Sequence, residues 1–94
     1  MTDLYHKLKD FAKKNNYNFI TDTQNNTTIL VITANYIDYS LIEYDNITSF
    51  RVEPTHLKDS SVYVPLPEDP STYFNFIIEN ILRDKLELEQ EIAS

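Results

Sequence analysis

The residues that could support chemistry are few, and the most obvious group surrounds His56. Glu53 and Asp59 lie three positions before and three positions after this histidine. Carboxylates and imidazole are metal ligands, but this spacing, with Pro54 inside it, matches no ligand pattern of defined geometry. We therefore expect a solvated loop around His56, and we predict neither a metal site nor any other cofactor.

Nucleophilic catalysis has no better support in the sequence. The chain has no cysteine, and Ser60-Ser61 lacks the Gly-x-Ser-x-Gly turn that presents a catalytic serine. His6 lies off the apolar stripe of the first helix, so we expect it at the surface. The chain also contains no glycine, which excludes the phosphate-binding loops that need close backbone approach. The sequence therefore predicts a protein that is not an enzyme.

The segment from Tyr36 to Asp45 has the composition of a protein-binding surface. Its tyrosines combine rigid amphipathic rings with neighbouring carboxylates, and tyrosine is enriched at protein interfaces. The alternative is a half-exposed strand whose tyrosines pack across strands with their hydroxyl groups in water. The predicted partner-binding residues are Tyr36, Asp38, Tyr39, Glu43, Tyr44 and Asp45.

The charge of the chain indicates what kind of partner to expect. The net charge is -7, and the lysines concentrate in the first 16 residues, so the remainder is strongly acidic. Phosphate-rich surfaces attract Lys and Arg, which argues against direct nucleic-acid binding and against anionic membranes. With no cysteine and no long apolar run, we expect a cytoplasmic protein that binds a basic protein partner.

In size, acidity and lack of catalytic groups the chain resembles the phage-borne inhibitors of host defence, including anti-CRISPR proteins. This resemblance is one of overall profile and assigns no residue roles. It implies a nucleic-acid mimic, in which carboxylates at strand spacing occupy a lysine-rich and arginine-rich groove, in the host cytoplasm if the chain is phage-encoded. The alternative is a homodimeric structural or chaperone-like protein that uses an apolar sheet face or its C-terminal helix.

The elements that must position these residues can be read from apolar runs and from asparagines. Asn tolerates the positive φ angles that glycine usually supplies, so the asparagines indicate where the chain turns. The aliphatic run Thr28 to Ala34 predicts a central strand. A helix should precede the strands, ending near Lys14. The further strands are predicted at Tyr17 to Thr21, Tyr36 to Tyr44, Ile47 to Glu53 and Ser61 to Pro65.

The connections between these strands are too short for crossover helices, so the sheet must be an antiparallel meander. A long C-terminal helix should begin after Asp69 as N-cap with Pro70 at its first position. Residues beyond Leu86 are expected to project, either frayed or paired with another chain. The predicted architecture is a single α+β domain over residues 1–94: N-terminal helix, five-stranded antiparallel meander sheet and long C-terminal helix.

Both helices are expected on one face of this sheet, which would leave the second face without cover. The residues predicted on that second face are Ile20, Leu30, Ile32, Ile42 and Tyr63. Such an apolar, tyrosine-bearing face indicates a partner or a second copy of the chain. The alternatives are one helix on each side of the sheet, or a sheet curled enough to shield the face.

Overall fold

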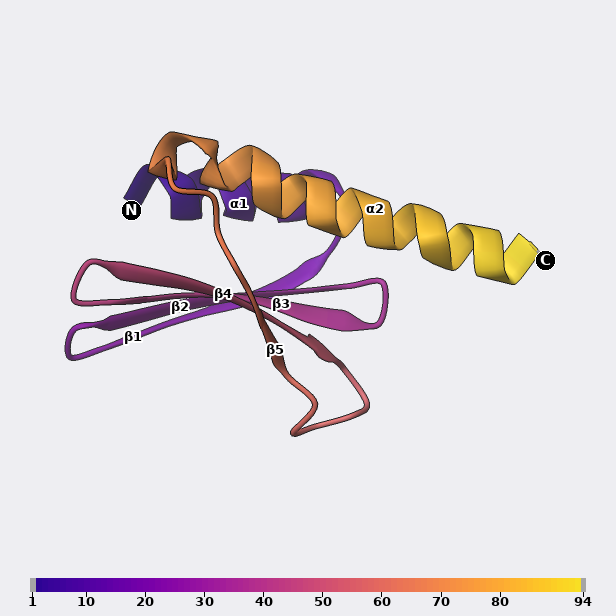
Figure 1. The fold of residues 1–94 in the computed structure, drawn as a ribbon, viewed down its shortest axis with the longest axis horizontal. Helices are drawn as coiled ribbons and strands as arrows, with labels where there is room; N and C mark the ends of the chain where they lie inside the picture. Colours follow the sequence, from indigo (N-terminus) through magenta and orange to yellow (C-terminus); the bar gives the residue numbers. More distant parts are fainter. Residues whose placement is uncertain (1, 94) are drawn as a thin grey trace.

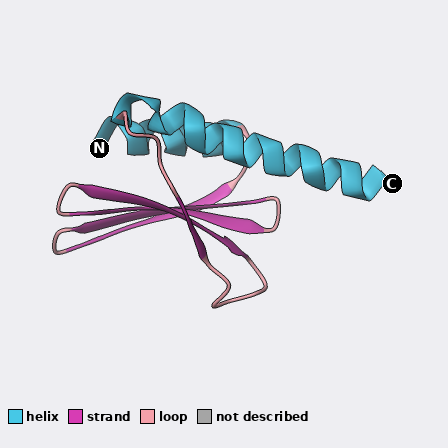
Figure 2. Ribbon diagram, in the orientation of Figure 1, coloured by secondary structure: helices cyan, strands magenta, loops and turns pink. Residues whose placement is uncertain are grey.

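Two helices lie against one side of a five-stranded antiparallel sheet, and none of the described elements lies against the other side (Figures 1 and 2). The computed structural model describes residues 2–93. The elements are α1 (Thr2–Lys14), β1 (Asn18–Gln24), β2 (Thr27–Ala34), β3 (Ile37–Tyr44), β4 (Ile47–Pro54), β5 (Val62–Val64), the 3-10 turn η1 (Pro70–Thr72) and α2 (Tyr73–Ala93). The predicted α+β architecture is confirmed.

The sheet is a meander with strand order β1-β2-β3-β4-β5, and every neighbouring pair is antiparallel. Two-residue turns join the first four strands. Both residues of the Asn35-Tyr36 turn have positive φ, and so do both residues of the Asp45-Asn46 turn. This is the backbone of a type I′ turn, which matches the twist of the strands it joins. In this glycine-free chain asparagine does supply most of the left-handed positions, as the sequence predicts.

Strand β1 is longer than its sequence predicts. The polar residues Asp22 to Gln24 continue the strand and pair with β2, ending with Gln24 opposite Thr27. Only Asn25 and Asn26 remain for the turn. Pairing with the long, apolar β2 overrides the low strand propensity of these polar residues. At the other edge, β5 covers only three residues and is shorter than predicted.

The hydrophobic core lies between the helices and one face of the sheet. Its buried members on the sheet are Leu30, Ile32, Ala34, Tyr39, Leu41 and Phe50; those on the helices are Tyr5, Leu8, Ala12, Ile77 and Ile81. Leu30 and Ile32 are almost fully buried beneath the helices. Their predicted position on the uncovered face is therefore wrong, because β2 is apolar on both sides and its composition does not show which side the helices cover.

Helix α2 begins as the sequence predicts and is then fixed to the sheet by polar bonds. The Asp69 carboxylate caps η1 by accepting from the Ser71 backbone N–H at 3.0 Å. Further along, the Asn35 side-chain amide donates to the Ile81 carbonyl at 2.9 Å. The C-terminal part of α2 runs past the strands, and the start of α1 lies toward the opposite end of the molecule (Figure 1). None of the helices described is long and apolar enough to cross a membrane.

Candidate protein-binding surfaces

The uncovered side of the sheet, called the open face below, presents a set of apolar side chains. The pairing register places Ile20, Val31, Ser40, Arg51 and Tyr63 in one row across the five strands. The apolar members of the open face are Ile20, Ile29, Val31, Ile42, Tyr44, Ile47 and Tyr63. Four of them are strongly exposed, with Ile20 at 69% and Ile47 at 66%. Exposed apolar side chains that adjoin one another in this way are typical of a protein interaction surface.

One end of the open face is polar and holds the loop between β4 and β5. The Asp38 carboxylate accepts from the Thr33 hydroxyl at 2.9 Å and from the Thr55 hydroxyl at 3.1 Å. The Lys58 ammonium lies 3.5 Å from Asp38 and 3.9 Å from Glu53. Asp38 is therefore already occupied by partners within the chain. Its role in this structure is to anchor the loop.

Arg51 lies near the middle of the open face and is incompletely paired. Its Nε is buried and has no hydrogen-bond partner, and within residues 2–93 it forms no ion pair. Its cross-strand neighbours are Ser40 on β3 and Tyr63 on β5. A buried donor without an acceptor is unfavourable by about 1–3 kcal/mol. The Nε is covered by atoms of the chain itself, so this donor stays unsatisfied inside the structure.

Tyr39, one of the six predicted partner-binding residues, points away from the surface. It is only 2% exposed and lies on the helix side of the sheet, stacked against Phe50. Its hydroxyl donates to the Asp84 carboxylate at 2.8 Å and accepts from the Asn35 amide at 3.1 Å. Burial, and to a lesser degree the bond to Asp84, raises the pKa of the Tyr39 phenol well above its usual range. Tyr39 fixes α2 to β3 and is not accessible to a partner.

The other five predicted residues do not form one surface. Tyr36 lies in the turn before β3 and Asp38 near its start, whereas Glu43 and Tyr44 lie at its end and Asp45 in the turn that follows. Eight strand residues span about 26 Å at ~3.3 Å each, so the two groups are far apart. Strand alternation divides them again, because Asp38 and Tyr44 belong to the open face and Glu43 to the helix side. Residues that are adjacent in the sequence therefore do not share one surface, because successive side chains of a strand point to opposite faces of the sheet.

The end of the sheet that carries the β1–β2 and β3–β4 turns, called the tip end below, has a polar hollow of about 260 Å³. Asn25, Asn26, Thr28, Glu43, Asp45 and Asn46 line it. Glu43 and Asp45 form no ion pair in the described part of the chain. A second hollow of about 290 Å³ adjoins it between α1 and the sheet, and His6 and Lys9 contribute to its wall. The tip end thus has two unpaired carboxylates among amide and hydroxyl groups.

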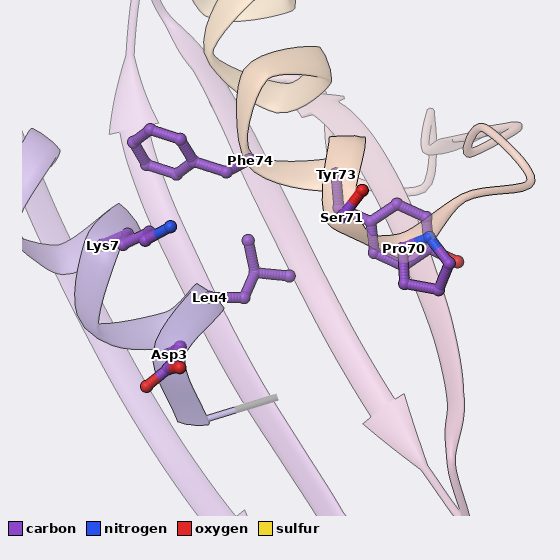
Figure 3. A pocket seen from close by; sticks show the side chains of 7 residues that line it. All are labelled: Asp3, Leu4, Lys7, Pro70, Ser71, Tyr73 and Phe74. Carbon is purple, nitrogen blue, oxygen red and sulfur yellow. The ribbon is translucent and has the colours of Figure 1, made fainter.

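Between the first turns of the two helices lies another hollow, of about 280 Å³ (Figure 3). Leu4 and Phe74 form its apolar wall, and the Lys7 ammonium lies 5.7 Å from the centre of the Phe74 ring. A cation over an aromatic face at this distance is attracted by the ring quadrupole. Lys7 therefore has a contact that holds it against α2. The charged side chains in the lining of this hollow are Asp3 and Lys7, which have opposite signs.

The group around His56 does not come together as a metal site. His56 and Asp59 are exposed, and the nearby Glu53 pairs with Lys58 instead. Among residues 2–93 there is no cluster of three or more side chains from His, Cys, Asp and Glu that could hold a metal ion. The loop has the solvated character that its sequence predicts.

Comparisons of this chain with protein-family models, with curated proteins and with solved structures each find no match. Function must therefore be argued from the surfaces described above. The prediction from the sequence assigned the wrong β2 residues to the open face. The four consecutive aliphatic residues Ile29 to Ile32 do indicate that both sides of β2 are apolar. A sheet covered on one side only must then expose two of them.

Proposed function

We propose that this chain is a small, non-enzymatic, cytoplasmic protein that binds a basic surface on another protein through the tip end. The observation that supports the proposal best is the hollow with two carboxylates, Glu43 and Asp45, that form no ion pair within residues 2–93. Unpaired carboxylates at a concave site favour a cationic ligand group. The acidic body around them, with a net charge of -7 for the chain, attracts the same kind of partner.

The lining of the hollow suits the head group of an arginine or lysine from the partner. Carboxylates accept charge-assisted hydrogen bonds, and an arginine fork can use two acceptors at once. The Asn25, Asn26 and Asn46 amide oxygens and the Thr28 hydroxyl supply further acceptors. The neighbouring hollow shares Glu43 with this one, but it has Lys9 in its wall and lacks Asp45. A partner's cation is therefore directed to the turns and away from α1.

Imitation of nucleic acid is a finer version of this proposal. It would require several free carboxylates at regular spacing along the strands. Asp38 is engaged by Thr33, Thr55 and Lys58, so the predicted series along β3 loses a member. Competition between DNA and the chain for one basic partner would be the specific test of mimicry. Binding of a partner's cation at the tip end does not depend on whether the chain imitates nucleic acid.

An NMR titration of the labelled protein with a nona-arginine peptide tests the proposal. We expect the amide signals of the tip end to shift most, because the guanidinium groups enter the polar hollow. The double variant Glu43→Gln/Asp45→Asn should weaken binding about tenfold, as expected for the loss of about 1.4 kcal/mol of charge-assisted hydrogen bonding. Raising the salt concentration should weaken wild-type binding, because exposed charges are screened.

The matched control is Glu87→Gln/Glu89→Gln, which removes the same charge from the exposed end of α2. This variant should keep most of the affinity. If both double variants lose affinity equally, the peptide responds only to net charge and the tip end is not its site. A nona-glutamate peptide should produce no shifts at all.

A homodimeric structural or chaperone-like protein is the second candidate function, and the apolar open face favours it. The tip-end hollow involves Thr28 and Glu43, which belong to the helix side of the sheet. A homodimer formed through the open face would leave that hollow accessible. The two functions are therefore compatible, and each can be tested without the other.

A further inference from the structure

We infer that the open face binds a second copy of this chain, so that two sheets pack face to face in a symmetric homodimer. This inference is independent of partner binding at the tip end. It rests on two observations: the extent of the apolar surface, and the arrangement of its rows, which also gives Arg51 a polar neighbour.

The open face is large enough for a dimer interface. The four long strands have seven or eight residues at ~3.3 Å each, and five strands are separated by four spacings of ~4.8 Å, which gives a face of about 25 Å by about 19 Å with the three-residue β5 at one edge. Its flat projection is on the order of 480 Å², and the relief of the side chains makes the accessible area larger. A standard interface takes about 800 Å² from each partner. The open face supplies most of that area.

The rows of the open face can complement a second copy of themselves. The apolar residues Val31, Ile29 and Ile42 lie in the two middle rows. A polar row with Asp38 lies at one end, and a row with Tyr44 and Ile47 lies at the other. A two-fold axis across the strands sets each middle row against the other, so the aliphatic residues meet at the centre. Two sheets in this arrangement form an aligned sandwich about 10 Å thick.

The choice of axis follows from charge. An axis along β3 would place Asp38 opposite the partner's Asp38, and like charges facing each other are destabilising. An axis across the strands instead brings the Tyr44 phenol close to the partner's Asp38, where it can donate a hydrogen bond. The Asp38–Lys58 pair weakens that repulsion without removing it, so the second arrangement is the favoured one.

Arg51 gains a neighbour in the same arrangement. Strand β4 then crosses its own copy in the opposite direction, which places Arg51 close to the partner's Ser49. That hydroxyl can accept from the terminal N–H groups of the guanidinium, since Arg51 as a whole is only partly buried. Because the symmetry repeats this contact, it forms twice in each dimer. A partner of unrelated sequence would have to supply such acceptors separately.

The test compares two isoleucines of nearly equal exposure. Ile20 on the open face is 69% exposed, and Ile92 near the end of α2 is 74% exposed. Light scattering coupled to size exclusion should show wild-type dimers at about 100 µM. Ile20→Glu should shift the population to monomers, with a rise in dissociation constant of at least tenfold. Ile92→Glu should leave the dimer intact.

A monomeric wild-type chain at that concentration would overturn the inference, and so would dissociation by Ile92→Glu alone, which would locate a dimer at α2. Salt gives a second readout, because an apolar interface between two acidic chains should persist or strengthen as salt is raised. Dimers that dissociate in high salt would also contradict the inference.

A further variant separates face packing from edge pairing of β1, whose outer side has no strand partner. Ile47→Glu lies on β4, away from that edge, and is 66% exposed in the wild type. Face packing requires that Ile47→Glu also weakens the dimer. If Ile20→Glu dissociates the dimer while Ile47→Glu does not, the chains pair through β1 and the inference is wrong. Both variants should still bind the nona-arginine peptide, so the two proposals fail separately.

Discussion

The two faces of the sheet have similar residues and different surroundings. On β2, Leu30 and Ile32 are buried beneath the helices, whereas Ile29 and Val31 on the opposite face are only half-buried. The aliphatic content of the two faces is nearly the same. What differs is that α1 and α2 pack on one side. Which face of β2 is buried is therefore decided by where the helices pack. The composition of the strand shows only that both of its faces are apolar enough to be buried.

The two faces also differ in how completely their polar groups are hydrogen-bonded. On the helix side the Tyr39 hydroxyl has two partners, and the Tyr5 hydroxyl donates to the Thr28 carbonyl at 3.0 Å. The Tyr17 phenol, beside Phe11, is an exception there because its buried oxygen has no partner. On the open face the incomplete group is Arg51, a charged residue. On the helix side most buried polar groups have partners. The open face instead combines exposed apolar side chains with an unsatisfied charged residue.

The largest difference in the free energy of unfolding should appear when isoleucine is replaced by alanine on each of the two faces. Ile32→Ala, at a site 2% exposed, should lower the free energy of unfolding by about 3 kcal/mol, because it removes buried methyl groups and leaves a cavity. Ile20→Ala should change it by less than about 0.5 kcal/mol in the monomer. Urea denaturation at two protein concentrations provides the measurement.

The concentration dependence sharpens this comparison. The loss caused by Ile32→Ala should be the same at both concentrations, since it arises inside one chain. The loss caused by Ile20→Ala should grow with concentration, because the proposed dimer would bury Ile20. Equal losses for the two variants in dilute solution would mean that the open face is covered within the monomer.

A smaller effect is expected from the polar contact that holds α2 to the sheet. Tyr39→Phe should lower the free energy of unfolding by about 1.5–2 kcal/mol, because the hydroxyl donates to a carboxylate. Tyr63→Phe on the exposed open face is the matched control and should change stability by less than about 0.5 kcal/mol. If Tyr39→Phe is equally mild, the contact between Tyr39 and Asp84 contributes little and packing alone positions α2.

Alkaline pH should act through the same side of the sheet. Burial raises the pKa of Tyr5 to about 12 and raises the pKa of Tyr39 further. The unfolded chain ionises its phenols near pH 10, whereas the folded chain keeps these two neutral. Stability should therefore be complete below about pH 10 and be lost as pH rises through 12. Tyr39→Phe should make that loss less steep in urea titrations between pH 8 and pH 12.

The smallest effect concerns the turn that sets which residues belong to which face. Tyr36 has φ of 63°, a left-handed conformation that is unfavourable for a bulky side chain. Tyr36→Gly converts the turn to Asn-Gly, the favoured type I′ pair, and should raise the free energy of unfolding by about 0.5–1 kcal/mol. Thermal unfolding monitored by circular dichroism provides the measurement.

Tyr44→Gly is the contrasting variant, because it places glycine inside a strand and should lower stability. If Tyr36→Gly lowers stability as well, the Tyr36 ring makes contacts that outweigh the backbone strain. The ring is 67% exposed, so the part of it that is covered within the chain would have to supply those contacts.

Local patterns in the sequence were enough for most of the architecture. The asparagines mark the turns, Asp69 and Pro70 mark the start of the last helical segment, and the short connections require a meander. These features depend on neighbours in the chain, so the residues themselves specify them. The exception is the end of β1. Its polar residues have low strand propensity, but pairing with β2 keeps them in the strand.

The sequence determined the order of helices and strands, and it determined that β2 is apolar on both sides. Only the tertiary structure decided that α1 and α2 cover the side of Leu30, that Tyr39 is internal, and that Glu43 and Asp45 meet the asparagines of the tip end. The physical reason is the two-residue period of a strand. It separates the two faces in the sequence, but docking of the helices, which depends on contacts between distant residues, selects the face that becomes the core.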